Sequence, residues 1–452
     1  MAQSKNIKRW IDRINSSSSS DSVIVDALLK IRPFSKRQSG INDILCEGGI
    51  ECFLKLIQRP NKKILDVTIS ILANCLTEDI IRKKVSECQG IPSIVKVLQT
   101  IKHPTIITRT CRSIANLANN LECSKTIHGV GTAELILKLI KYPTTTEDCV
   151  SSALRAIKNL ANTTSHRKKL IQNNAVHVLT KCFNSDTNEV VTSAIRALAA
   201  ISQSCTIEFA DHMLSNDGES IRKLVHVVKE SKEDSEKDKS EALSILINLT
   251  LQGCARPMLG NSGALECIVD ELKNILGDSI NISRKMQGPL QENSFRIVGA
   301  LCYCCREAIN RARLRSMDAL SLFIRLLSDN RWITVHNFIL TSLLCFVYDE
   351  VGLKILHDSG IFNILLSKLK EYTIQEQRLF SEEQNTSSKA VKMIWDGHGV
   401  DDNEKFDRRH SLSCDVPTRF NQRPNVQKED KNTNDIELTF RTLTEFEYEW
   451  VT

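Results

Sequence analysis

Apolar segments recur along this chain at a nearly constant interval. Each follows a small or turn-forming residue, as in GGIECFLKLI, QGIPSIVKVL and GTAELILKLI. From residue 48 to residue 359 the seven intervals average about 44 residues, a period typical of proteins built from stacked helical units. The eight openings are Gly48, Gln89, Gly131, Asn174, Asn216, Gly263, Asp318 and Ser359.

A second apolar helix signal follows each of the first seven openings at a distance of about 25 residues or more. A short helical segment precedes each opening, and no strand-like alternation competes with this pattern. We therefore expect an all-α fold: a right-handed α-solenoid of about eight three-helix repeats, in which stacking buries each unit's apolar face. Gly or Asn at an opening suits the positive φ of a sharp turn between the first and second helices.

The ends of the chain depart from this pattern. Residues 1–40 predict an N-terminal capping segment, with a polar helix, a serine linker and one further helix. The repeats are expected over residues 41–396, closed by SSKAVKMIW at 387–395. An inserted surface loop is expected at 276–294. Residues 397–452 turn polar and predict a disordered tail.

Composition and charge argue against three classes of protein: nucleic-acid-binding, membrane-spanning and secreted proteins. The 60 Lys and Arg residues against 54 Asp and Glu residues give a net charge of +6, too small over this length to indicate nucleic-acid binding by charge alone. No apolar run approaches the length of about 18 residues that a membrane span requires. The polar, basic N-terminus lacks a secretory signal, so we expect the chain to stay inside the cell.

The residues offer no catalytic chemistry. The 16 cysteines are scattered through apolar stretches, where reduced core thiols are expected. Cys302, Cys304 and Cys305 form the one dense thiol cluster, without the paired spacing of a zinc site. No phosphate-binding loop, dinucleotide fingerprint or hydrolase motif occurs. We therefore expect a non-catalytic protein with no metal and no cofactor.

The recurrent openings and the L-x-N-L pattern of the third helices resemble armadillo repeats over roughly residues 40–396. Four segments resemble more specifically the armadillo region of the family of armadillo repeat-containing protein five: LDVTISILANCLTE (65–78), RAIKNLANTTSHRKKL (155–170), ARPMLGNSGALECIVDEL (255–272) and CREAINRARLR (305–315). The last is the most specific, because the repeat pattern does not demand it.

The resemblance implies an adaptor of the cytoplasm and nucleus. That family is regarded as the substrate-recognition subunit of a cullin-based ubiquitin ligase, with the largest subunit of RNA polymerase II as substrate. Its members carry a C-terminal BTB domain, and no such α/β pattern follows the repeats before Thr452. A cullin contact is therefore doubtful, and a non-degradative scaffold or cargo-binding protein is the alternative function.

The third helices carry a row of asparagines in one register: Asn74, Asn116, Asn159 and Asn248, with Ala200 and Ala300 at two equivalent positions. An Asn side chain both donates and accepts hydrogen bonds, and the resemblance implies that such a row pairs with the backbone of an extended peptide in the concave groove. The alternative is that each Asn caps the end of a neighbouring helix.

Arginines stand four residues before this row, on the same helix face: Arg112, Arg155, Arg196 and Arg296. Nuclear-import armadillo carriers use tryptophan there. Guanidinium groups bind carboxylate or phosphate, so we expect the groove to bind an extended acidic or phosphorylated peptide. The alternative is an exposed face that only aids solubility.

Two further basic features stand outside the groove. A first helix carries Arg306, Arg311, Arg313 and Arg315. They either contact a partner or nucleic acid, or form a solvated helix with family-specific packing. In the tail, Arg408 and Arg409 precede Ser411, a context that basic-directed kinases favour and that makes Ser411 a candidate phosphorylation site.

Overall fold

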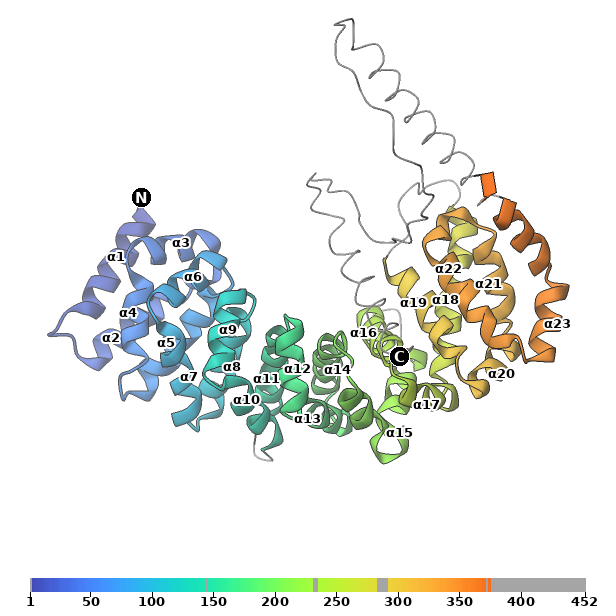
Figure 1. The fold of residues 1–452 in the computed structure, drawn as a ribbon. Helices are drawn as coiled ribbons and strands as arrows, with labels where there is room; N and C mark the ends of the chain where they lie inside the picture. The colour runs from blue at the N-terminus through green and yellow to red at the C-terminus, as the bar shows by residue number, and fades with distance from the viewer. Residues whose placement is uncertain (1, 143–144, 231–234, 283–291, 371–372, 375–452) are drawn as a thin grey trace, which may run out of the picture. The chain divides into compact units, whose positions relative to one another are not determined.

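The computed structural model describes residues 2–142, 145–230, 235–282, 292–370 and 373–374. All regular secondary structure in these ranges is helical (Figure 1). Residues 1–375 group into one unit by their contacts, and the remaining residues lie outside the described part. The all-α prediction is confirmed.

The described helices fall into the expected triplets. Consecutive third helices pack against one another in chain order, as do many neighbouring first and second helices. The first helices are α3 (Gln38–Cys46), α6 (Asp79–Glu87), α9 (Leu121–Gly129), α12 (Thr164–Gln172), α17 (Arg256–Asn261), α20 (Ala308–Ser316) and α23 (Glu350–Asp358). The second helices are α4 (Gly49–Leu56), α7 (Gly90–Thr100), α10 (Thr132–Lys141), α13 (Ala175–Lys181), α18 (Ala264–Ile282) and α21 (Ala319–Leu327).

The third helices are α5 (Lys62–Cys75), α8 (Pro104–Leu117), α11 (Glu147–Leu160), α14 (Asn188–Ser202), α16 (Glu236–Leu249), α19 (Glu292–Cys304) and α22 (Ile333–Leu343). In the fifth repeat α15 (Ile207–Glu230) spans the first and second helices with a non-helical break at 215–218. Before the first repeat lie α1 (Ala2–Asn15) and α2 (Asp21–Ile31). Short 3₁₀ turns are η1 (Phe34–Lys36), η2 (Cys182–Asn184), η4 (Gly253–Ala255), η5 (Asn330–Trp332) and η6 (Leu344–Phe346).

The predicted turns between first and second helices have the expected backbone conformation. Gly48 (φ 72°), Gly131 (φ 71°) and Asn174 (φ 63°) adopt the left-handed region, which glycine enters freely and asparagine tolerates. Equivalent positive φ values occur at Gln89, Asn216 to Gly218, Gly263, Asp318 and Gly360. In the eighth repeat the turn residue is therefore Gly360, one position after the predicted Ser359.

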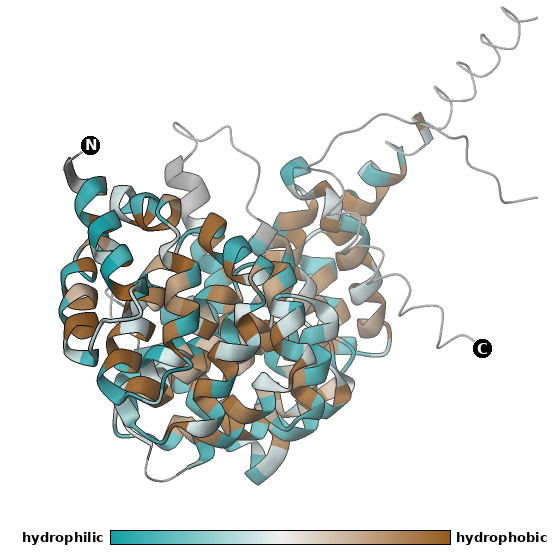
Figure 2. Ribbon diagram, turned by 90° about the vertical axis from the view of Figure 1, so that its left-hand side faces the viewer, coloured by the Kyte–Doolittle hydropathy of each residue, from teal (hydrophilic) through white to brown (hydrophobic). Residues whose placement is uncertain are grey.

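The core runs along the whole stack. Phe53 in α4 and Phe323 in α21 are fully buried, as are many of the aliphatic residues of the third helices. Figure 2 shows hydrophobic and hydrophilic residues alternating along the helices, as expected when each unit covers its neighbour. The cysteine prediction is also confirmed: Cys302, Cys304 and Cys305 are buried in α19 and directly after it.

The expected loop differs in part from the structure, and the expected C-terminal segments lie outside the described residues. The inserted loop expected at 276–294 is helical at both of its ends, because α18 continues to Ile282 and α19 starts at Glu292. Residues 283–291, between these helices, lie outside the described residues. Apolar residues such as Leu272 and Leu276 are buried and extend the helix into the expected loop. The closing segment at 387–395, the tail at 397–452 and Ser411 all fall outside the described residues.

Candidate functional site

The candidate binding residues lie on the third helices. Because α5, α8, α11, α14, α16 and α19 pack side by side in chain order, equivalent positions on them form a ladder across what we call the third-helix face. The asparagines stand near the C-terminal ends of α5, α8, α11 and α16, and the arginines one turn earlier on α8, α11, α14 and α19.

Each asparagine donates a hydrogen bond to the preceding layer. Asn116 Nδ2 donates to the Ala73 carbonyl at 2.8 Å, and Asn159 Nδ2 donates to the Ala115 carbonyl at 2.7 Å. Asn74 and Asn248 donate in the same direction, to Ser35 Oγ at 2.9 Å and Ser202 Oγ at 2.8 Å. The four asparagines therefore tie α5, α8, α11 and α16 to the layer before each of them. This is the structural role that the sequence left open beside peptide binding.

Each of three arginines donates to the asparagine of the preceding repeat. Arg112 Nη2 lies 2.6 Å from Asn74 Oδ1, and Arg155 Nη2 lies 3.1 Å from Asn116 Oδ1. Arg296 repeats the contact, with Nη2 at 2.7 Å from Asn248 Oδ1. Three of the arginines are thus linked to three of the asparagines in separate pairs. Since an amide has two N–H donors and an oxygen with two lone pairs, each asparagine keeps capacity for a further partner.

Arg196 behaves differently. Its Nε and Nη2 lie 2.9 Å and 2.8 Å from Asp238 Oδ1 on α16. This carboxylate neutralises the guanidinium and ties the fourth repeat to the fifth. Sequence position alone placed Arg196 with the other three arginines, whereas the structure gives it a different partner.

Positive charge gathers on the third-helix face around α8. Burial lowers the pKa of the Arg112 guanidinium, and the nearby Arg109, Arg155 and Arg32 lower it further. Arg109 forms an ion pair with Asp66. Arg112 and Arg155 have only neutral asparagine oxygens as hydrogen-bond acceptors in the described part of the chain, so their charge stays uncompensated there.

Sequence reasoning missed a second row of arginines, on the first helices. Arg82 Nη1 donates to the Leu76 and Thr77 carbonyls at 3.0 and 2.8 Å, at the end of the preceding third helix. Arg167, Arg256 and Arg311 make equivalent contacts. They satisfy carbonyls that a helix end leaves without partners. Their recurrence about six residues after the last turn of a third helix is a sequence signal that aligned repeats would have revealed.

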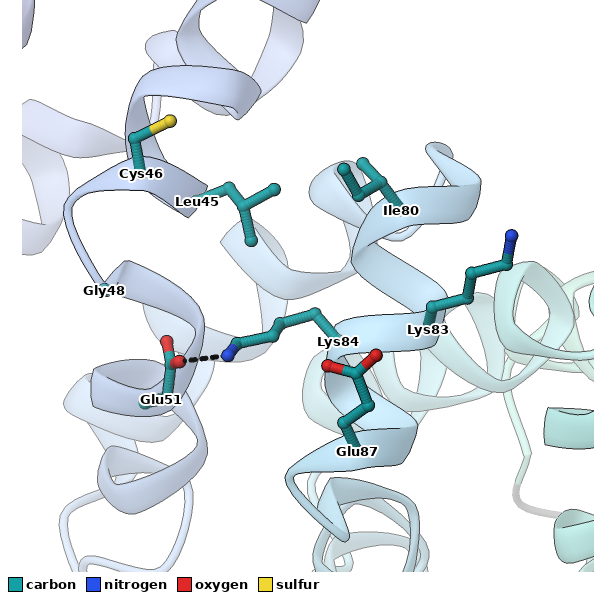
Figure 3. A pocket seen from close by; sticks show the side chains of 8 residues that line it. All are labelled: Leu45, Cys46, Gly48, Glu51, Ile80, Lys83, Lys84 and Glu87. Carbon is teal, nitrogen blue, oxygen red and sulfur yellow. Dashed lines mark ion pairs between the residues drawn. The ribbon is translucent and has the colours of Figure 1, made fainter.

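A small surface pocket lies between α3, α4 and α6 (Figure 3). Lys84 Nζ reaches across it to Glu51 Oε1 at 2.7 Å. The same second-helix glutamate pairs with the next first helix elsewhere: Glu134 with Lys169 and Glu266 with Arg313. The pocket therefore coincides with a recurrent ion pair that joins neighbouring repeats.

The basic run of the seventh repeat packs within the protein. Arg311 donates to the Cys305 carbonyl at 2.9 Å, and Arg313 donates to Asn261 Oδ1 at 3.2 Å. Arg315 pairs with Asp349, and Arg306 lies over the Tyr303 ring at 5.2 Å. These contacts agree with the family-specific packing that the sequence weighed against a partner contact.

Among the residues that the structure describes, no group of three or more His, Cys, Asp or Glu side chains is placed to hold a metal ion. Among the same residues, every helix is too short or too polar to cross a membrane.

Comparison with known proteins places the chain in a family. The family model described as ARMC5 matches residues 63–365. Armadillo repeat-containing protein 5 of Mus musculus is 34% identical over 308 residues, which cover 68% of this chain and 32% of the mouse protein. The matched stretch is thus about a third of that relative's length.

Solved structures share the fold at low sequence identity. An engineered protein of the Northeast Structural Genomics Consortium aligns with a TM-score of 0.62 and 20% identity over 78% of this chain and 82% of that one. A structure from work on a phosphorylation switch between cadherin and beta-catenin aligns with a TM-score of 0.59 and 14% identity, covering 76% and 63% of the two chains. With the stacked three-helix repeats and the family match, the chain belongs to the ARMC5 family of armadillo repeat proteins.

Proposed function

We propose that this protein is a non-catalytic adaptor whose third-helix face binds an extended acidic or phosphorylated peptide. The observation that carries the proposal is the charge of Arg112 and Arg155. Both guanidinium groups are held by neutral asparagine oxygens, and neither has a carboxylate partner among the described residues. The face therefore presents fixed positive charge without a counter-charge.

The chemistry of these groups selects the ligand. A guanidinium presents a planar fork of N–H donors that matches carboxylate and phosphate oxygens. Only one of the five N–H groups of a guanidinium is engaged in each contact from Arg112 or Arg155 to its asparagine. Asn74 and Asn159 are half-buried, and their remaining amide capacity suits the backbone of an extended peptide, whereas Asn116 and Asn248 are buried. Arg296 continues the arginine row at its far end.

We further propose that the adaptor is the substrate-recognition part of a cullin-based ubiquitin ligase in the cytoplasm and nucleus. Its proposed substrate is the largest subunit of RNA polymerase II. Family membership supports this role, and the charge of the third-helix face suits a phosphorylated, repetitive tail. The similarity spans 32% of the mouse relative, so recruitment of the cullin is a separate part of the proposal.

Peptide titration tests the proposal. Fluorescent peptides from the repetitive tail of the polymerase subunit, phosphorylated and unphosphorylated, are titrated into the full chain and into the Arg112→Glu, Arg155→Glu double variant. We expect the phosphorylated peptide to bind at least about tenfold more tightly, a difference of about 1.4 kcal/mol. The double variant should lose that preference, and added salt should weaken binding.

The opposite results are equally informative. Equal binding of both peptides, or an unchanged phosphate preference in the double variant, would contradict an anion-binding face. Phosphate-dependent binding without any effect on polymerase ubiquitination in cells would instead support the alternative function, a non-degradative scaffold or cargo-binding protein.

A further inference from the structure

A chain of hydrogen bonds joins Arg112 to the segment before the first repeat. Arg112 Nη2 donates to Asn74 Oδ1 at 2.6 Å, and Asn74 Nδ2 donates to Ser35 Oγ at 2.9 Å. Ser35 Oγ in turn donates to the Arg32 carbonyl at 2.8 Å. This chain fixes the backbone of Arg32, the residue that caps the C-terminal end of α2, close enough for the charge of its side chain to act on Arg112.

The position of Arg32 was invisible in the repeat pattern. It precedes the first opening at Gly48 and belongs to no asparagine–arginine pair. Its side chain is half-buried, and its charge acts on Arg112 together with those of Arg109 and Arg155. The structure therefore adds a residue that aligned repeats would not have supplied.

Counter-charges separate these arginines into two groups. Arg109 pairs with Asp66, and Arg196 pairs with Asp238. Arg32, Arg112 and Arg155 form no ion pair with a carboxylate in the described ranges, where the acceptors of Arg112 and Arg155 are amide oxygens. Three positive charges thus gather over α2, α8 and α11 without compensation, and like charges held close together favour a bound anion.

We propose that Arg32, Arg112 and Arg155 form one anion-binding subsite, which receives the phosphate or carboxylate group of the bound peptide, and that Arg196 lies outside it. This inference rests on the proposed function and locates the ligand's negative charge at the N-terminal end of the third-helix face. Arg196, with both nitrogens directed at Asp238, instead joins the fourth and fifth repeats.

Single substitutions test the location of the subsite. The probes are two fluorescein-labelled nine-residue peptides of glycine and alanine, one with a central phosphoserine and one with a central glutamate, titrated into the full chain. We expect Arg32→Gln, Arg112→Gln and Arg155→Gln each to weaken phosphoserine binding by about tenfold or more, as loss of a charge-assisted pair implies. The matched control Arg196→Gln should change it by less than about twofold, because its charge is already neutralised.

A footprint provides a second measurement that does not depend on the variants. Saturating phosphoserine peptide should slow amide hydrogen exchange in residues 31–36 and in α8 and α11 of the wild-type chain, and leave α14 and α16 unchanged. Arg32→Lys should retain most of the binding that Arg32→Gln loses, because the charge is kept. Thermal unfolding of each variant checks that the fold is preserved.

The outcomes distinguish the two proposals. If the wild-type chain binds neither probe, the anion-binding function itself fails. If phosphoserine binding is lost in Arg112→Gln but unchanged in Arg32→Gln, or is weakened equally in Arg196→Gln, the peptide-binding function stands and the location of the subsite is wrong. A footprint centred on α14 and α16 would overturn the inference in the same way.

Discussion

Asn116 shows how one residue serves two neighbouring layers. It is only 3% exposed, and its amide joins the Ala73 carbonyl of one repeat to Arg155 of the next. A buried amide of this kind contributes to stability mainly because the groups around it would otherwise lack partners. The same contact holds the Arg155 guanidinium in place in the proposed anion-binding subsite.

We predict that Asn116→Ala destabilises the protein by about 1 to 3 kcal/mol, because the Ala73 carbonyl loses its partner and Arg155 loses its acceptor. Urea unfolding followed by circular dichroism measures the change. Asn119→Ala, at an exposed position three residues further along, is the matched control and should stay within about 0.5 kcal/mol. Equal stability of the two variants would rule out the structural role of Asn116.

Two stacked histidines make stability depend on pH. The rings of His128 and His166 lie 4.0 Å apart. His128 Nε2 contacts the Leu160 carbonyl at 3.0 Å, while its Nδ1 is buried without a hydrogen-bond partner. Burial lowers the pKa of His128, with nearby Lys169 adding to the shift. Burial and the neighbouring His128 lower the pKa of His166 to about 4.

Both rings therefore bind a proton less readily in the folded protein than in the unfolded chain, where the ordinary pKa is 6.5. Their contribution to stability is fully present above about pH 6.5 and falls as the pH drops towards 4. We predict a lower urea midpoint at pH 5.0 than at pH 7.5, and a smaller difference in His166→Gln. The control variant His226→Gln, at an exposed position on α15, should show the same difference in urea midpoint as the wild type. If His226→Gln also shows a smaller difference, the pair of His128 and His166 does not cause the pH dependence.

At the scale of the helices, the turn between first and second helices is the most regular feature. Positive φ recurs at that position in every repeat, on Gly, Asn, Gln or Asp. Branched side chains are strongly disfavoured in this region because Cβ approaches the backbone. The next first helix often carries, in its first turn, an arginine that donates to carbonyls at the end of the preceding third helix, as Arg82 does. The turn residue therefore fixes the boundary between the first and second helices, and an arginine of the next repeat often satisfies carbonyls at the end of the third helix.

We predict that Asn174→Val destabilises the fourth repeat by about 1 to 2 kcal/mol, since valine must adopt the left-handed conformation there. Asn174→Gly at the same position should be neutral or slightly stabilising, because glycine adopts positive φ without cost. Thermal unfolding of the two variants gives the comparison. A valine variant as stable as the glycine variant would mean that the turn relaxes to another conformation.

At the scale of the whole unit, contacts run mainly between neighbouring layers. Stability in such a stack is approximately a sum of repeat terms and neighbour terms. The residues of the seventh repeat therefore have little direct effect on the second. Local opening free energies should differ along the chain, as hydrogen exchange measures them.

Matched core substitutions test this locality. Phe53 in α4 and Phe323 in α21 are both fully buried, and replacing either by alanine is expected to cost about 3 to 5 kcal/mol locally. We predict faster amide exchange in α20 to α23 for Phe323→Ala with α4 to α8 unchanged, and the reverse for Phe53→Ala. Uniformly faster exchange in either variant would show that the stack unfolds as one cooperative unit.

The sequence by itself determined the helices, their triplet order and the turns. These depend on local properties: the period of apolar residues within a helix, and the low steric cost of positive φ at Gly131 or Asn174. The match of CREAINRARLR also placed the family correctly. The rows of asparagines and arginines were visible for the same reason, because they share a register within one helix.

Only the tertiary structure decided the partners of those side chains. Arg112, Arg155 and Arg196 look equivalent in sequence, yet the first two bond to asparagines of the preceding repeat and the third to Asp238 of the following one. The backbone of Arg32 is linked to the candidate site through Ser35 and Asn74. The acceptors of these side chains lie about 40 residues away in the sequence. Which acceptor a side chain reaches depends on how neighbouring repeats pack, and the local sequence pattern does not contain that information. The charge that remains uncompensated, and hence the candidate anion subsite, is set by this packing.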